Sequence, residues 1–177
     1  MAKRKKQDWA RLWDKIERNS ASRDERIDAA ILAGKLADSS PAPKLLRLLE
    51  DEDGEVRYYA LTSLVLDLQQ TDDLMKQRSW ALLREDPDEY VRGMAAACLG
   101  KILFNLRSRS VFSDLLAELR GAQQPSLARG SVYRALFEVA GRPPLEWPGV
   151  LGPSKVFEES DIDWDKVAWL ESLMENP

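Results

Sequence analysis

The chain has 177 residues, of which 44% are hydrophobic and 32% are charged, and its formal net charge is −4. This composition is typical of a soluble, helix-rich protein with one domain and a sizeable core. The absence of histidine and the single cysteine, Cys98, exclude a Cys/His zinc site, a Cys–His nucleophile and an intramolecular disulfide.

Hydrophobic periodicity predicts four helices in the first part of the chain. Ser22 and Glu25 have the spacing of a capping box, in which the hydroxyl accepts the Glu25 amide and the carboxylate reaches back, so they open the second helix. Ser40 as N-cap and Pro41 at the first helical position open the third. The four helices are predicted at about 7–18, up to 37, from 40 onwards, and 54–68.

Five further helices are predicted in the second part. Thr71 caps the fifth helix and Asp88 the sixth, while Pro125 begins the eighth and Gly141 ends it. Ser160 caps the last helix, which follows a stretch rich in proline, glycine and tryptophan. No segment alternates apolar and polar residues in the manner of a strand. The predicted spans are about 72–84, 89–104, a helix around 111–119, 125–141 and 161–175.

One helix pattern, Val-Arg-x-x-Ala-x-x-x-Leu, recurs along the chain. It occurs at 56–64 and 91–99 and, in a weaker form, at 128–136. Aligning its arginine brings in an earlier stretch of similar composition. The aligned arginines are 31, 35 and 37 residues apart, namely Arg26, Arg57, Arg92 and Arg129. A repeat of this length predicts a solenoid of stacked helix pairs.

The second and third units resemble HEAT-like repeats of the phycobilisome-lyase type, on the residues Asp53-x-x-Val56-Arg57-x-x-Ala60-x-x-x-Leu64 and Asp88-x-x-Val91-Arg92-x-x-Ala95-Ala96-x-x-Leu99-Gly100-Lys101-Ile102. The resemblance covers about 22–141 and weakens in the fourth unit, where Pro125 replaces the aspartate. It implies antiparallel helix pairs whose second helices line a concave face, with a ladder of aspartate and arginine along the stack. A structural role in that ladder is therefore expected for Asp53, Arg57, Asp88, Arg92 and Arg129.

We thus expect an all-α fold, a right-handed α-solenoid of antiparallel helix pairs closed by a non-repeat C-terminal segment. Residues 1–141 form the helical array, in which 1–21 is an N-terminal capping helix and 22–141 are the repeats. Residues 142–177, a Pro/Trp-rich linker and an acidic helix, are expected to belong to the same domain.

Two surfaces are candidates for binding a partner. Positions 2, 3, 6 and 10 after the motif valine lie off the buried stripe, and they carry residue types that are enriched at interface cores: Tyr58, Tyr59, Met94 and Arg134. The other candidate is the acidic end of the chain with Trp164, because residues 158–177 hold seven acids against one lysine. Each surface has a structural alternative, in which the tyrosines cover the adjoining repeat and the last helix closes the stack.

These residues predict binding rather than catalysis. The chain has no phosphate-binding glycine loop and no distinguished carboxylate pair, so we expect no enzyme activity, no cofactor and no metal. The leading hypothesis is a protein-binding module that uses the solenoid groove, either an immunity-type inhibitor of a toxin or an adaptor. Nucleic-acid binding is an alternative that the net negative charge disfavours. An accessory role in bilin attachment is a further alternative, which the name of the repeat alone suggests.

The sequence also bears on location. No apolar run approaches the roughly 18 residues needed to span a bilayer. The basic start of the chain is followed by Gln7 and Asp8 rather than by a secretory hydrophobic stretch. We therefore expect a cytoplasmic protein whose partner is another protein and not a membrane.

Overall fold

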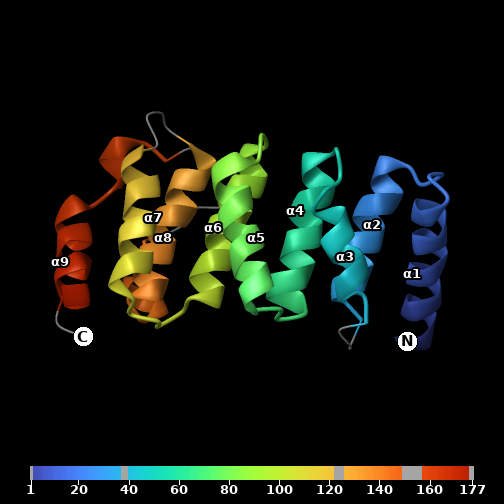
Figure 1. The fold of residues 1–177 in the computed structure, drawn as a ribbon, viewed down its shortest axis with the longest axis horizontal. Coiled ribbons are helices and arrows are strands. Elements are labelled where there is room, and N and C mark those ends of the chain that lie inside the picture. The colour runs from blue at the N-terminus through green and yellow to red at the C-terminus, as the bar shows by residue number, and fades with distance from the viewer. Residues whose placement is uncertain (1, 37–39, 122–125, 149–156, 176–177) are drawn as a thin grey trace. The chain divides into compact units, whose positions relative to one another are not determined.

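A computed structural model describes residues 2–36, 40–121, 126–148 and 157–175. Within these ranges the chain forms nine α-helices, one π-helical turn and two 3₁₀ turns, and no strand, which confirms the predicted all-α class (Figure 1). The isolated antiparallel bridge between Ser126 and Phe157 is the one β-type pairing of the described residues. The chain divides into two compact units, which we call unit 1 (residues 1–75) and unit 2 (residues 76–177).

Unit 1 is built from four helices and the π-helical turn that extends the fourth. Within it, α1 packs on α2, α2 packs on α4, and α3 packs on both α2 and α4. Small side chains on α2 permit this close packing, since Ala30 is fully buried and its carbonyl accepts the hydroxyl of Ser63 at 2.9 Å. The elements are α1 (Ala2–Glu17), α2 (Arg23–Gly34), α3 (Ala42–Leu48), α4 (Gly54–Thr62) and the π-helical turn η1 (Ser63–Asp67).

Unit 2 contains most of α5 and all later elements. Its centre is the pair α6 and α8, and α7 and α9 pack against α8 and against each other. The apolar stripes of α6 and α8 are both buried, as the identical spacing in the two helices predicts. The side of α6 that meets α8 carries Gly93 and Gly100, whose ideal Cβ positions lie close to Ala128 and Ala135. The elements are α5 (Asp73–Glu85), α6 (Glu89–Ile102), α7 (Arg109–Gly121), α8 (Leu127–Val139), η2 (Pro144–Glu146), η3 (Glu159–Asp161) and α9 (Trp164–Glu175).

Several helix starts agree with the capping residues in the sequence. Ser22 accepts the Glu25 amide while the Glu25 carboxylate accepts the Ser22 amide, which is the predicted capping box. Asp53 is the N-cap of α4 and Asp88 is the N-cap of α6, and each accepts two backbone amides of the first turn. The local pattern of hydrogen-bonding side chains thus places these helix starts correctly.

Other helix starts differ from the prediction. The third helix begins at Ala42 with Pro41 rather than Ser40 at the N-cap position. The last helix begins at Trp164 rather than Asp161, because Asp163 accepts the Lys166 amide while Ser160 lies in a separate 3₁₀ turn. Similarly, Asp72 rather than Thr71 accepts the amide of Met75 at the start of α5. In each of the last two cases a carboxylate next to the helix takes the role predicted for a hydroxyl.

The eighth helix begins one residue later in the repeat than the others. Ser126 is its N-cap and accepts the Arg129 amide, whereas the predicted first residue, Pro125, lies outside the described residues. Arg129 is therefore three residues after its N-cap, while Arg57 and Arg92 are four residues after theirs. Gly141 has a φ of 68°, the left-handed conformation expected of a glycine that ends a helix.

The only cysteine lies at the centre of unit 2. Cys98 is fully buried in α6. Burial, and to a lesser extent the charge of Glu138, raises the pKa of its thiol to about 12. The thiol is therefore protonated at neutral pH and acts as a small apolar side chain in the core.

Candidate functional site

The two tyrosines predicted to bind a partner lie on α4 in unit 1. Tyr58 and Tyr59 are half-buried, and their rings meet edge to face with centroids 5.3 Å apart. Met94, with which Tyr59 was expected to form the centre of a groove, lies half-buried on α6 in unit 2. A groove that joins Tyr59 to Met94 depends on how the two units are placed relative to each other, so it stays a prediction.

The other two predicted contact residues are held by neighbours within unit 2. The Nε of Arg134 donates to Glu138 at 2.8 Å, and its guanidinium lies 4.4 Å from the ring centre of Trp147. The indole nitrogen of Trp164 donates to Glu159 at 2.7 Å. Arg134 keeps 39% of its side chain exposed, so it remains available to a partner at a cost in internal contacts.

The face of the second helices that was expected to be open to a partner, formed by positions 2, 3, 6 and 10 after the motif valine, is narrower than predicted. Gly93 and Gly130, both at position 2, and Glu138 at position 10 are buried. The physical reason is the close approach of α6 and α8 for Gly93 and Glu138, and the packing of Phe157 for Gly130. The ideal Cβ position of Gly93 lies 3.5 Å from the Cα of Ala128, and that of Gly100 lies 1.8 Å from a carboxylate oxygen of Glu138. The buried stripe is therefore wider than the motif residues alone suggest.

The residues of the expected ladder form two matching sets of contacts. One guanidinium nitrogen of Arg57 donates to the carbonyls of Asp51 and Glu52 at 2.7 and 3.1 Å. Arg92 donates to the carbonyls of Asp86 and Pro87 at the same two distances. Each arginine thus holds the loop before its own helix. A link between repeats is made by Arg23, whose Nε donates to Asp53 at 2.7 Å. Desolvation raises the pKa of this carboxyl, but the bonds from Arg23 and from the first amides of α4 together outweigh it and lower the pKa.

Arg129 departs from this pattern. Its guanidinium donates to the carboxylate of Glu159, which precedes the last helix. This bond, followed by the bond from Trp164, lowers the pKa of Glu159. Arg129 therefore connects α8 to the C-terminal segment instead of to another repeat.

Glu138 is a buried carboxylate in unit 2. Desolvation raises its pKa above the ordinary value of 4.5, and the contact with Arg134 and the charge of Lys101 only partly offset this effect. A carboxyl whose native pKa is raised binds its proton more tightly in the folded than in the unfolded protein. The free energy of unfolding therefore falls as pH rises from 4.5 through the raised native pKa.

Glu138→Gln is expected to remove this pH-dependent decrease in the free energy of unfolding, and it keeps a side-chain oxygen that accepts the hydrogen bond from Arg134. Relative to the wild type, the free energy of unfolding of the variant should increase with pH across that window and then stay constant. Urea unfolding at several pH values from 4 to 8 measures it, with the exposed Asp114→Asn as the control for an equal change in charge. If the wild type instead gains stability relative to the variant as pH rises, the pKa of Glu138 is lowered on folding rather than raised, which contradicts the prediction.

Every tryptophan of the chain lies against a cation, which sequence reasoning missed. The cation-to-centroid distances run from 4.4 to 5.9 Å. The cations also pair with carboxylates, so each cluster joins a ring, a cation and an acid. Only one pair, Trp80 with Arg84, has the helical spacing that could have revealed it. The pairs are Trp9 and Trp13 with Lys44, Trp80 with Arg84, Trp147 with Arg134, Trp164 with Arg120, and Trp169 with Arg142.

A cavity of about 240 Å³ lies in unit 2 between α8 and the C-terminal segment, and we call it the C-terminal cavity. Its aromatic lining residues, Tyr133, Phe137 and Phe157, are all buried, and the rings of Tyr133 and Phe137 meet edge to face. Charged residues complete the lining. In full, it is lined by Tyr133, Phe137, Glu146, Pro148, Phe157, Asp161, Asp163 and Lys166.

The C-terminal cavity carries more negative than positive charge. Glu146 is paired with Arg142 through two bonds of 2.8 Å, and Asp163 lies 3.5 Å from the amine of Lys166. The hydroxyl of Tyr133 accepts the Asp163 amide at 3.3 Å. Burial raises the pKa of this hydroxyl, so it keeps its proton and can donate to a ligand. Aromatic faces next to carboxylates suit a cationic group.

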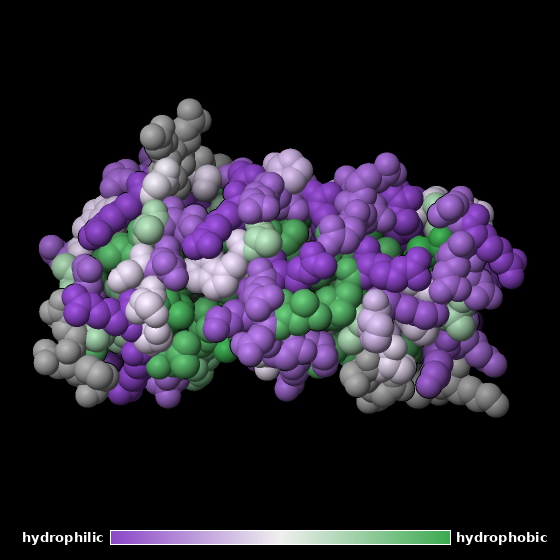
Figure 2. Space-filling view, viewed as in Figure 1, coloured by the Kyte–Doolittle hydropathy of each residue, from purple (hydrophilic) through white to green (hydrophobic). Residues whose placement is uncertain are grey.

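Exposed hydrophobic side chains lie at one end of unit 2, where α6 and α8 end. Phe104 and Leu106 are about half exposed and Leu145 is 99% exposed. Backbone bonds hold these loops together, since the Asn105 amide donates to the Glu138 carbonyl at 2.9 Å. Figure 2 shows hydrophobic atoms at the surface along the lower edge of this unit. Leu145 directly precedes Glu146 of the C-terminal cavity.

Comparisons with known proteins identify no relative of this chain. No protein-family model matches the sequence, and no curated protein or solved structure is detectably similar to it. The described residues contain no group of three or more potential metal ligands, and none of their helices is long and apolar enough to cross a membrane.

Proposed function

We propose that the chain is a non-catalytic protein-binding module, built as a right-handed α-solenoid of HEAT-like helix pairs. The observation that carries the proposal is the C-terminal cavity, in which acidic groups surround an aromatic lining. Such a site suits the ammonium or guanidinium of a lysine or arginine on a partner protein. An immunity-type inhibitor of a toxin and an adaptor both use a surface of this kind.

The surroundings of the C-terminal cavity favour a protein over a small cation. The fully exposed Leu145 directly precedes Glu146 of the cavity lining, and the half-exposed Phe104 and Leu106 add apolar area at the end of unit 2 where α6 and α8 end. Apolar anchors beside a charged pocket are the usual composition of a protein interface. A nucleic acid is disfavoured because the acids of the cavity repel phosphate.

The repeat contacts support the solenoid. Asp53 and Asp88 cap their helices in the same way, and Arg57 and Arg92 bind the preceding loops at equal distances. Neighbouring second helices also pack on each other within each unit, α2 on α4 and α6 on α8. Recurring contacts of this kind are what a stack of similar units requires.

The partner can be isolated by co-purification from the native cell, and its affinity can then be measured with purified variants. Asp161→Asn combined with Asp163→Asn removes two charges of the cavity and keeps side chains that accept the local backbone bonds. We expect the affinity to fall at least tenfold, which corresponds to about 1.4 kcal/mol. Asp28→Asn combined with Asp114→Asn makes the same change in net charge at exposed positions outside the cavity, and should bind normally.

The alternative surface is tested with the same partner. If Tyr59→Ala with Arg134→Ala weakens binding while the cavity variant binds normally, the partner uses the predicted groove of second helices instead of the cavity. Deletion of residues 158–177 tests the acidic end with Trp164. Turnover of a substrate by the purified chain would contradict the proposal as a whole.

A further inference from the structure

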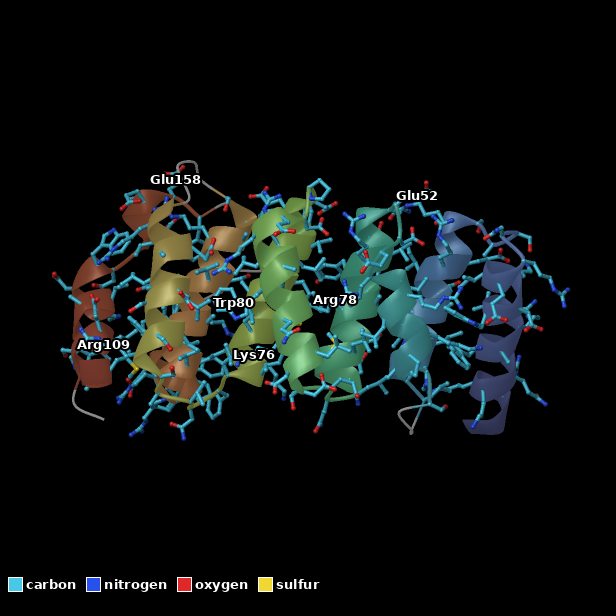
Figure 3. The ribbon with its side chains drawn as sticks, in the orientation of Figure 1. Glu52, Lys76, Arg78, Trp80, Arg109 and Glu158 are labelled. Carbon is cyan, nitrogen blue, oxygen red and sulfur yellow. The ribbon has the colours of Figure 1, made fainter. Side chains whose placement is uncertain are left out.

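A second cavity of unit 2, of about 310 Å³, is lined by three arginines and a single carboxylate, and we call it the arginine cavity. Arg84 comes from α5, Arg92 from α6 and Arg129 from α8, while the carboxylate is Glu118 of α7. Ser126 also lines it. Trp80 on α5, labelled in Figure 3, lies beneath Arg84 at 4.6 Å. The lining therefore carries excess positive charge.

The three arginines are unequally satisfied. Arg84 is paired with Glu118 at 2.7 Å. Arg92 binds two backbone carbonyls and forms no ion pair with a described residue. Arg129 is only 5% exposed; a terminal guanidinium nitrogen pairs with Glu159, but its Nε has no hydrogen-bond partner among the described residues. A buried guanidinium donor left without an acceptor is costly, and an anion in the cavity would supply that acceptor.

Two further acids lie next to the arginine cavity and bind groups of its walls. Glu89 accepts the Leu127 amide at 2.6 Å, and Glu159 accepts from both Arg129 and Trp164. Neither carboxylate belongs to the lining. The N-terminus of α8, a helix of thirteen residues, adds partial positive charge at Ser126 and Ala128, part of which the Glu89 carboxylate at the Leu127 amide offsets.

The repeat explains why the positive charge remains here. The three residues at the corresponding place before the second helices α4, α6 and α8 are 51–53 (Asp-Glu-Asp), 86–88 (Asp-Pro-Asp) and 123–125 (Gln-Gln-Pro). The loop acids thus decrease from three to two to none, while the repeat arginine is kept. In unit 1 a terminal nitrogen of Arg26 donates to the Asp51 carboxylate at 3.2 Å, although the Arg26 Nε, like that of Arg129, has no well-aligned acceptor among the described residues. Asp51 belongs to the loop before α4, the next second helix after that of Arg26. The corresponding position for Arg92 is residue 123, a glutamine, so Arg92 has no such acid, whereas Arg129 pairs with Glu159.

We propose that the arginine cavity binds a phosphate monoester, with Arg84, Arg92 and Arg129 as its cationic ligands. Guanidinium groups match the oxygens of phosphate in paired hydrogen bonds, and the N-terminus of a helix favours the same dianion. At about 310 Å³ the cavity is at the lower end of the usual range for small ligands, roughly 300–1,000 Å³, so it has room for more than the bare anion. The site is distinct from the C-terminal cavity and does not depend on the proposed protein partner.

The repeat itself provides the test variant. Ser126→Asp keeps a good N-cap and restores the acid that Asp53 and Asp88 supply in the other repeats, but it puts a carboxylate into the cavity. Ser126→Asn keeps the cap without the charge and is the matched control. Arg84→Gln removes one ligand that forms no contact with the helix caps. Circular dichroism confirms that each variant is folded.

Binding is measured by calorimetry at constant ionic strength, with inorganic phosphate, glycerol 3-phosphate, a phosphoserine peptide and chloride as probes. We expect saturable binding of phosphate and tighter binding of at least one ester, accompanied by a change in the fluorescence of Trp80. The affinity should fall at least tenfold in Ser126→Asp and in Arg84→Gln, and should stay within about twofold in Ser126→Asn.

The two ester probes distinguish the two possible sources of a phosphate monoester, a small metabolite and a phosphorylated protein. Preference for glycerol 3-phosphate indicates a small metabolite, and preference for the peptide indicates a phosphorylated protein. Binding of inorganic phosphate without binding of either ester would overturn the assignment of a monoester. Absence of saturable phosphate binding, or equal affinity in the wild type and Ser126→Asp, would overturn the site.

Discussion

Gly130→Ala is expected to destabilise unit 2 by about 2 kcal/mol or more, although alanine is the better helix former. The ideal Cβ position at residue 130 lies 2.6 Å from the Cδ2 of Phe157 and 2.9 Å from its Cε2. Phe157 is buried, and its backbone is tied to Ser126 by two bonds of 3.2 Å. The ring therefore has to leave its position, and with it the segment that lines the C-terminal cavity.

A double-mutant cycle separates this clash from other effects. Phe157→Ala alone should cost about 3–5 kcal/mol, because a buried aromatic ring is lost. In that background Gly130→Ala should stabilise by up to about 1 kcal/mol, the helix preference of alanine over glycine. The sign of the second substitution thus reverses. Gly121→Ala is the control, since a Cβ there meets no atom within 4 Å. Destabilisation of equal size in both backgrounds would exclude the contact with Phe157.

Arg57→Ala is expected to lower the free energy of unfolding of unit 1 by about 2–3 kcal/mol. The substitution leaves the carbonyls of Asp51 and Glu52 without the guanidinium that binds them, in a site where Arg57 is only 8% exposed. Denaturant unfolding measures the loss. Arg57→Lys should recover part of it, because an ammonium can bind one carbonyl but lacks the planar fork.

Arg92→Ala is the matched comparison in unit 2. Arg92 makes the same two bonds at the same distances but is half-exposed, so water can replace the lost donors. The loss should be about 1–2 kcal/mol. Losses below about 0.5 kcal/mol at both positions would show that the arginines do not hold the loops and that the repeated motif has another cause.

Features set by a few neighbouring residues could be predicted from the sequence. The capping box at Ser22 and the caps at Asp53 and Asp88 depend on side chains within four residues of the amides they bind. The buried stripes of α6 and α8 follow from helical spacing alone. The all-α class follows from these two signals together.

Features that depend on distant contacts could not be predicted. The C-terminal cavity exists because Phe157 docks on α8 at Gly130, 27 residues earlier in the chain, and no local pattern reveals the importance of this glycine. The same is true of the pairing of Arg129 with Glu159. The arginine cavity was hidden for a different reason. The sequence shows the loss of the loop acids, but only the structure shows that Arg84 and Arg92 face the same space as Arg129.

The burial of Cys98 gives unit 2 a natural probe of its own opening. Unit 1 contains no cysteine, so a thiol reagent can modify the chain only in unit 2. Because the reactive species is the thiolate and the native pKa is about 12, the folded state is nearly inert at neutral pH. Modification must wait for an opening that exposes this part of α6, and its rate therefore measures how often the core of unit 2 opens around Cys98.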